Sequence, residues 1–122
     1  MITEIRHLLF QDDDLIRALI EYKKKRNESL PPGSIIGFKI EGNQRIVRCI
    51  LKICSDNCGE KIDFSFEHEE IREALIMYCL YKKIPLPAKI QKYLRMFGNR
   101  VGLFISLNLS HGEIKHLQRL AG

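Results

Sequence analysis

Long apolar runs are missing from this 122-residue sequence, in which no stretch approaches the ~18 unbroken apolar residues of a membrane-spanning helix. A secretory signal is also missing, because the first apolar stretch is short and the acids Asp12, Asp13 and Asp14 stand where a cleavage site would need small residues. We therefore expect no membrane association and a cytoplasmic location, in which cysteines stay reduced. The four cysteines concerned are Cys49, Cys54, Cys58 and Cys79.

Motifs of catalytic and metal sites are missing as well. The chain has no glycine-rich phosphate loop, no G-x-S-x-G nucleophile turn and no recognisable carboxylate pair. Structural zinc needs four ligands, usually in two close pairs, and only one C-x3-C pair is present, at Cys54 and Cys58. His111 and His116 are five residues apart and do not share a helix face. We predict no catalytic residue, no metal and no cofactor, with a thiol or zinc site at Cys54 and Cys58 as a third alternative.

Acidic residues are absent from the 39 positions from Ala74 to Gly112, although the chain holds 15 of them and has a net charge of only +5. The segment just before this gap, residues 60–73, carries six acids. Within the gap, the stretch Tyr81–Arg100 carries six basic residues. Such a separation of charge predicts either a dipolar surface or internal pairing between the two regions.

Apolar alternation predicts β-strands in the middle of the chain. Ile62, Phe64 and Phe66 alternate with polar residues, and the two segments before them are joined through a Gly-Asn pair that suits a hairpin turn. Residues 2–10 fit either a short helix or a strand. The predicted strands span residues 34–40, 45–54, 61–66 and 100–109.

Charge and apolar spacing predict the helices. Asp12–Asp14 stand before an apolar stripe and Lys23–Arg26 stand after it, which is the order that the helix dipole favours. The S-x-x-E sequence from Ser110 to Glu113 matches a capping box and predicts a C-terminal helix. The other predicted helices span residues 12–27, 67–82 and 88–97. The expected fold is one α+β domain over residues 1–122. It has a mostly antiparallel sheet of about four strands, a three-stranded meander plus a late strand, with helices packed on one face.

The predicted helix 88–97 separates its apolar residues from its cations. The apolar residues recur at the spacing of a buried helix face, and they are Ile90, Tyr93, Leu94 and Phe97. Solvated helix faces normally mix both signs of charge, because Glu–Lys pairs add a few tenths of a kcal/mol. A face with one sign therefore indicates a surface for an anionic partner, and the plain alternative is a solvated helix side. We name this surface the basic ridge, formed by Lys82, Lys83, Lys89, Lys92, Arg95 and Arg100.

A second basic cluster closes the first predicted helix. Cations at a helix C-terminus are explained by the helix dipole alone, although they would add to the basic ridge if the two lay side by side. The members of this cluster are Lys23, Lys24, Lys25 and Arg26.

Two functions follow from these patterns. The first is a small non-catalytic interaction module whose basic ridge binds an acidic protein surface, or residues 60–73 of a second copy. The alternative is a nucleic-acid-binding protein that uses the same ridge on phosphates. Single-strand binding also needs exposed rings. A helix at 88–97 would bury Tyr93 and Phe97, which leaves Tyr81 as the free ring.

Overall fold

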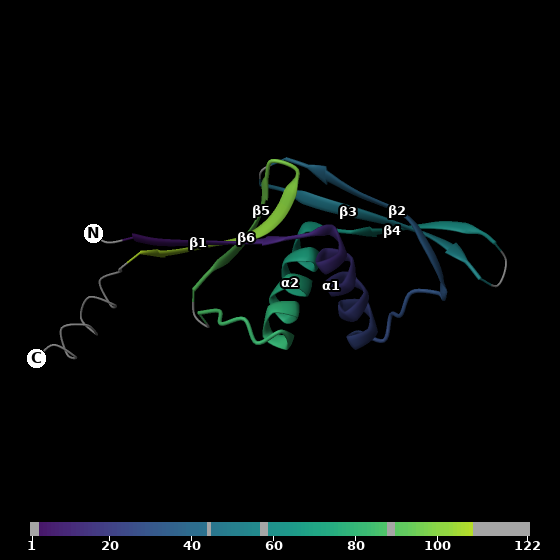
Figure 1. The fold of residues 1–122 in the computed structure, drawn as a ribbon, viewed down its shortest axis with the longest axis horizontal. Coiled ribbons are helices and arrows are strands. Elements are labelled where there is room, and N and C mark those ends of the chain that lie inside the picture. The colour runs from purple at the N-terminus through teal and green to yellow at the C-terminus, as the bar shows by residue number, and fades with distance from the viewer. Residues whose placement is uncertain (1–2, 44, 57–58, 88–89, 109–122) are drawn as a thin grey trace, which may run out of the picture.

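The computed structural model describes residues 3–43, 45–56, 59–87 and 90–108. Within these residues the chain forms two antiparallel three-stranded sheets, and the two helices lie side by side on one side of them (Figure 1). The predicted α+β class is confirmed. The elements in chain order are β1 (Thr3–Phe10), α1 (Asp12–Lys25), β2 (Gly33–Gly42), β3 (Val47–Ser55), β4 (Lys61–Phe66), α2 (His68–Tyr81), β5 (Lys92–Phe97) and β6 (Arg100–Asn108).

The predicted meander is the sheet β2-β3-β4, in which each strand pairs with the next. Lys52 lies opposite Asp63, and Leu51 lies opposite Phe64, so alternate residues of β3 face the helices and the solvent. Val47, Cys49, Leu51 and Ile53 are the inward residues and are all buried. The period-two alternation that predicted these strands therefore also defines their inner face.

The second sheet, β1-β6-β5, contains two strands that the sequence did not assign. Residues 2–10 were left between helix and strand, and Thr3–Phe10 pairs antiparallel with β6 along its whole length. The late strand β6 is therefore the central strand of a second sheet rather than the fourth strand of the meander.

The prediction of a helix over residues 88–97 is wrong, because Lys92–Phe97 forms β5. The spacing of Leu94 and its apolar neighbours fits a helix, but the same residues also alternate as a strand does. Pairing with β6 decides between the two, because Leu94 lies opposite Leu103 across a hairpin. The two-residue turn contains Gly98 at φ 66, a conformation that glycine adopts without steric cost.

The two predicted long helices are present with slightly shorter bounds. A capping box starts α2: Glu67 caps the helix, and the Glu70 side chain accepts a hydrogen bond from the Glu67 backbone N–H. Left-handed residues follow both helices, namely Asn27 at φ 57 and Lys83 at φ 60. No helix in the described residues is long and apolar enough to cross a membrane. The predicted C-terminal helix from Ser110 lies outside those residues.

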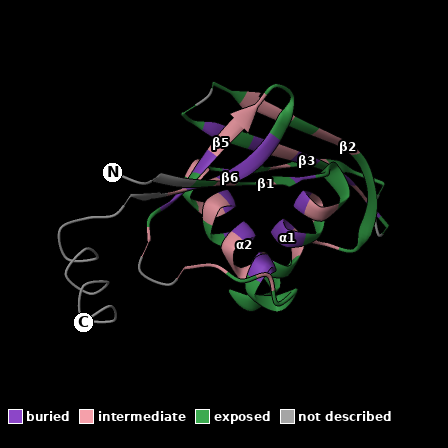
Figure 2. Cartoon of the chain, turned by 60° about the vertical axis from the view of Figure 1, so that its left-hand side comes forward, coloured by how far each residue is buried: buried purple, intermediate pink, exposed green. Residues whose placement is uncertain are grey.

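One cluster of buried side chains lies between the helices and both sheets (Figure 2). Tyr78 of α2 donates a hydrogen bond to Asp14 of α1 at 2.8 Å, and Tyr22 donates to Glu73 at 2.9 Å. The helices thus hold each other through buried rings whose hydroxyl groups reach acids at the surface. The largest fully buried side chains include Leu15 and Leu19 of α1, Ile71 and Leu75 of α2, Leu51 of β3, Phe66 of β4, Leu94 of β5 and Leu103 of β6.

Candidate functional site

Lys92, the middle member of the basic ridge, is buried and is only 8% exposed. Its Nζ atom donates hydrogen bonds to the carbonyl oxygens of Pro87 and, at 2.9 Å, of Ile90. Its own carbonyl oxygen accepts a hydrogen bond from Arg72 at 2.7 Å. In a strand, Lys92 points to the same side as Leu94, which is the inner side. The expectation that Lys92 faces an anionic partner is therefore corrected, because its ammonium group already has two acceptors.

The other ridge residues do not share one surface. Lys82 and Lys83 follow α2, whereas Arg95 and Arg100 lie on the β5–β6 hairpin, and Figure 1 shows the end of α2 and this hairpin on opposite sides of the molecule. Lys89 lies outside the described residues. A ridge running along one helix face does not form, because residues 92–97 are a strand that pairs with β6.

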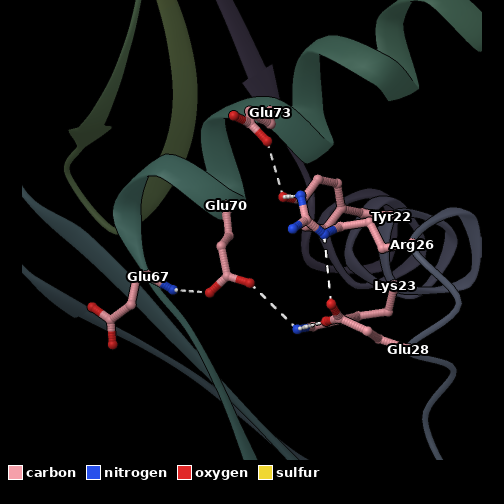
Figure 3. A network of polar contacts seen from close by, with 7 residues as sticks. All are labelled: Tyr22, Lys23, Arg26, Glu28, Glu67, Glu70 and Glu73. Carbon is pink, nitrogen blue, oxygen red and sulfur yellow. Dashed lines mark hydrogen bonds and ion pairs between the residues drawn. The ribbon is translucent and has the colours of Figure 1, made fainter.

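The second basic cluster is largely paired within the chain. Lys23 lies between Glu28, at 3.0 Å, and Glu70, at 3.3 Å (Figure 3). Its hydrogen bond to Glu28, more than any other contact, raises the pKa of Lys23. Arg26 donates a hydrogen bond to the Tyr22 hydroxyl at 3.0 Å. Lys25, by contrast, has no ion pair within the described residues.

The acidic segment 60–73 is also engaged within the chain, but with cations outside the basic ridge. Glu67 pairs with Arg48 at 3.0 Å, and Asp63 lies 3.9 Å from Lys52. Glu69 pairs with Arg72 at 3.4 Å. Internal pairing is thus the observed arrangement for these acids. None of the described ridge cations takes part in it.

A different surface brings rings and cations together, on the side of β1-β6-β5 that faces away from the helices. Opposite residues of paired strands point the same way, and Phe104 lies opposite both His7 of β1 and Tyr93 of β5. These three rings form a row across the sheet. We name this surface the aromatic face, formed by His7, Tyr93, Arg95, Phe97, Arg100 and Phe104.

The rings of the aromatic face contact one another. The His7 ring centroid lies 4.5 Å from that of Phe97 and 5.2 Å from that of Phe104. Tyr93 and Phe104 have centroids 6.4 Å apart, within the usual range of aromatic pairs. The Arg95 guanidinium lies 5.0 Å from the Tyr93 ring centroid, a cation–π distance. The side chains therefore support one another in a layer on the sheet.

Gly102 allows β1 to approach the central strand closely. It lies opposite Leu9 on one side and Arg95 on the other. A Cβ at this position would lie 2.7 Å from the carbonyl oxygen of Leu8 and 2.9 Å from Cδ2 of Leu9. A larger residue at position 102 would therefore push β1 away from β6.

The aromatic face is accessible and carries no negative charge. Tyr93 is 38% exposed, while Ile5 and Leu9 extend the face along β1 at 56% and 50% exposed. Arg100 lies directly opposite Phe97 and is exposed. No Asp or Glu is among the described outward residues of these three strands. Arg95 donates a hydrogen bond to the Leu94 carbonyl oxygen at 2.9 Å, and Arg100 lines a surface hollow with Asp12 without forming an ion pair with it.

One histidine and two cysteines outside the aromatic face are engaged within the chain. His68 Nδ1 accepts a hydrogen bond from the Val47 backbone N–H at 3.0 Å, and burial lowers the pKa of His68. Burial raises the pKa of Cys49 to about 12, so this thiol stays protonated. The Cys54 thiol donates to the Gly59 carbonyl oxygen at 3.6 Å. The described residues contain no group of three metal-ligating side chains, and Cys58 lies outside them.

Arg95 and Arg100 were predicted as binding residues from the sequence, but the rings beside them were not. A helix at 88–97 puts Tyr93 and Phe97 opposite Arg95, whereas a strand puts all three on one side. The signal that could have corrected this was the Gly98-Asn99 pair between two alternating segments, which is typical of a hairpin.

Comparisons with known protein families, with curated proteins and with solved structures found no match for this chain. The function proposed below is therefore inferred from the chain's own residues and their geometry.

Proposed function

We propose that this protein binds single-stranded nucleic acid on its aromatic face. The observation that supports this is the presence of four rings and two guanidinium groups on one open sheet face, with no carboxylate among the described outward residues. Proteins that bind single strands combine stacking rings with cations that follow the phosphates. The proposal takes up nucleic-acid binding, the alternative function predicted from the sequence, and moves it from a helix face to a sheet face.

Stacking on the central row supplies most of the affinity. Tyr93 and Phe104 belong to neighbouring strands, and their centroids are 6.4 Å apart, so successive bases can lie over them. A stacked base contributes about 1–3 kcal/mol by alanine substitution, which corresponds to roughly a 5- to 150-fold change in Kd. Because every base has a π-face, this mode carries little sequence preference.

Arg95 and Arg100 supply the phosphate contacts. Arg95 is held over Tyr93, and Arg100 stands at the end of the same face opposite Phe97. Two contacts predict a log Kd dependence on log salt with a slope of about 1.4, since each phosphate on a single strand contributes about 0.7. The salt dependence is therefore shallow, and stacking persists at salt concentrations that weaken purely electrostatic binding.

A single strand suits this face better than a duplex. Rings can stack only on bases whose faces are open, and a duplex covers those faces. Duplex readers insert a helix or a β-ribbon into a groove, whereas the aromatic face is the broad side of a sheet. RNA and DNA share the chemistry used here, so both are candidate ligands.

A protein partner, including a second copy, is the competing occupant of this face. Ile5 and Leu9 are exposed apolar residues at its edge, and such residues also suit protein interfaces.

The cytoplasmic location stays part of the proposal, supported by the free thiols Cys49, Cys54 and Cys79.

Fluorescence anisotropy with labelled 12-nucleotide U-RNA and T-DNA tests the proposal. We expect binding near 50 mM salt that weakens about 5- to 150-fold in Phe104→Ala and in Tyr93→Ala. Tyr81→Ala removes a ring that is 74% exposed at the end of α2, away from the sheet, and should leave Kd unchanged. Equal affinity of wild type and the Tyr93→Ala/Phe104→Ala double variant would exclude the aromatic face. Self-association that disappears in that variant, with no oligonucleotide bound, would favour the second copy.

A further inference from the structure

A pocket of about 290 Å3 lies between the two helices, on a surface separate from the aromatic face. Its lining includes the small side chains of Ala18 from α1 and Ala74 from α2, with Met77 beside them. Lys25 is the last residue of α1 and Lys82 directly follows α2, and Figure 1 shows these helix ends on the side away from the sheets. The helix ends thus surround a pocket with apolar side chains in its wall.

Three cations line this pocket, and two of them come from the basic segments noted in the sequence. Lys25 belongs to the second basic cluster and Lys82 to the basic ridge, and Arg17 joins them from the middle of α1. None of the three has an ion pair within the described part of the chain. One acid lines the pocket, Glu21, and it lies 3.6 Å from Lys24. The charge at the pocket is therefore positive.

We propose that the interhelical pocket binds an acidic, amphipathic helical segment of a partner protein. One apolar side chain of that segment enters the pocket, and its carboxylates meet Arg17, Lys25 and Lys82. The volume is near the lower limit of small-molecule sites, about 300 Å3, and it accommodates one large side chain. Tyr81, which lines the pocket, is 74% exposed and is available to the same partner. Helices commonly dock in such grooves through apolar anchors.

A second copy of this chain is a poorer occupant. The acids of segment 60–73 would have to supply the carboxylates, but Glu67, Glu69 and Glu70 already pair with Arg48, Arg72 and Lys23 of their own chain. The free energy lost by breaking these ion pairs would offset the free energy gained from the new ones. A partner whose acids are unpaired in its free state therefore suits the pocket better than residues 60–73 of a second copy.

Selection from a random 12-residue peptide display library tests the proposal. The targets are the wild-type chain and the Lys25→Glu/Lys82→Glu variant. A Lys39→Glu/Lys52→Glu variant changes the net charge by the same amount at exposed lysines of the sheet β2-β3-β4 that do not line the pocket. We expect wild type to enrich peptides with several acids around an apolar residue. Their Kd should rise at least tenfold on the pocket variant and less than threefold on the control.

The other outcomes overturn the proposal. Enriched peptides without acids, no enrichment above background, or equal weakening on both variants would each do so, the last because it would show a general charge effect. Far-ultraviolet circular dichroism of each variant verifies folding. Lys25→Gln/Lys82→Gln, which adds no acid beside a helix C-terminus, replaces the reversal if the latter unfolds. U-RNA binding to the same variants should stay unchanged, so the two proposed sites can fail independently.

Discussion

The sheets β2-β3-β4 and β1-β6-β5 contribute similar inner faces to one core, but their outer faces differ in charge and ring content. On the outer face of β2-β3-β4, Glu41 lies 3.5 Å from Lys39 and 3.8 Å from Arg48, and Lys52 lies 3.9 Å from Asp63. On the outer face of β1-β6-β5 the rings contact one another, and the arginines have no carboxylate among the described outward residues. The first face is satisfied by its own residues, and the second is open to a ligand.

This difference teaches that net charge is a poor guide to the binding surface. Both outer faces carry cations, but cross-strand acids neutralise those of β2-β3-β4. Asp63 and Glu67 of segment 60–73 pair with Lys52 and Arg48 of this sheet. The gap in acidic residues from Ala74 to Gly112 leaves Arg95 and Arg100 without such partners. The distribution of acids, more than the number of cations, separates the two faces.

The largest expected effect tests whether the inner faces are equivalent. Leu51→Ala in β3 and Leu103→Ala in β6 each remove a side chain that is fully buried, so each should lower the free energy of unfolding by about 2–5 kcal/mol. Urea denaturation measures both. If one variant lost less than about 1 kcal/mol, its sheet would not belong to the cooperative core.

A smaller effect tests the glycines on the two outer faces. Alanine at Gly102 would meet the Leu8 carbonyl oxygen at 2.7 Å, whereas alanine at Gly37 would meet the Lys52 Cβ at 3.6 Å, an ordinary contact. Gly102→Ala should therefore cost about 1–3 kcal/mol of unfolding free energy, as overpacking does. Gly37→Ala should change it by less than about 1 kcal/mol. Equal thermal midpoints for the two variants would show that β1 can shift away from β6 at this contact without loss of stability.

Charge reversal tests the outer faces directly. Arg95→Glu should weaken U-RNA binding about tenfold, because a carboxylate would replace a phosphate-binding group within the aromatic face. Lys52→Glu makes the same charge change on the other sheet and should alter Kd less than threefold. Fluorescence anisotropy gives both values. Equal losses would indicate that the field of the whole protein, and not the aromatic face, attracts the strand.

The smallest expected effect is a pH dependence confined to one sheet. His68 accepts the Val47 N–H and ties β3 to α2, whereas Arg72, which does not titrate, ties α2 to β5. Burial lowers the pKa of His68 below its ordinary 6.5, so the unfolded chain takes up the proton first as the pH falls. The stabilisation of the folded state by neutral His68 is present above pH 6.5, and it is lost as the pH falls through the lower pKa that His68 has in the folded protein.

Urea midpoints at pH 7.5 and 5.5 measure this effect. The wild-type midpoint should fall more than that of His68→Asn, whose amide oxygen stands at the position of Nδ1 and accepts the same hydrogen bond without titrating. Equal falls in both proteins would assign the pH dependence to other groups.

The two sheets also differ in how well the sequence predicted them. Strands β3 and β4 alternate between apolar and polar residues, and the charged ends of α1 and α2 fit the helix dipole, so local patterns were sufficient there. Strand β5 has apolar residues whose spacing fits both a helix and a strand. Only pairing of Leu94 with Leu103, contributed by another part of the chain, resolves that ambiguity.

The candidate site was likewise predicted only in part from local sequence patterns. Arg95 and Arg100 were found from the missing acids, but Tyr93 and Phe97 were assigned to the buried side. Lys92 was assigned to the surface although two carbonyl oxygens hold it inside. Each of these errors follows from assigning residues 92–97 the side-chain repeat of a helix. A helix and a strand place the same six residues on different faces.

The amino acids alone were enough to place both long helices, the three-stranded meander and the acid-free segment, because these depend on neighbours within a few residues. The orientation of β5, the burial of Lys92 and the meeting of Lys25 with Lys82 at one pocket depended on contacts between segments far apart in the chain. Local patterns specify which residues share a face once the backbone conformation is known. The choice of conformation at residues 92–97 required a partner strand.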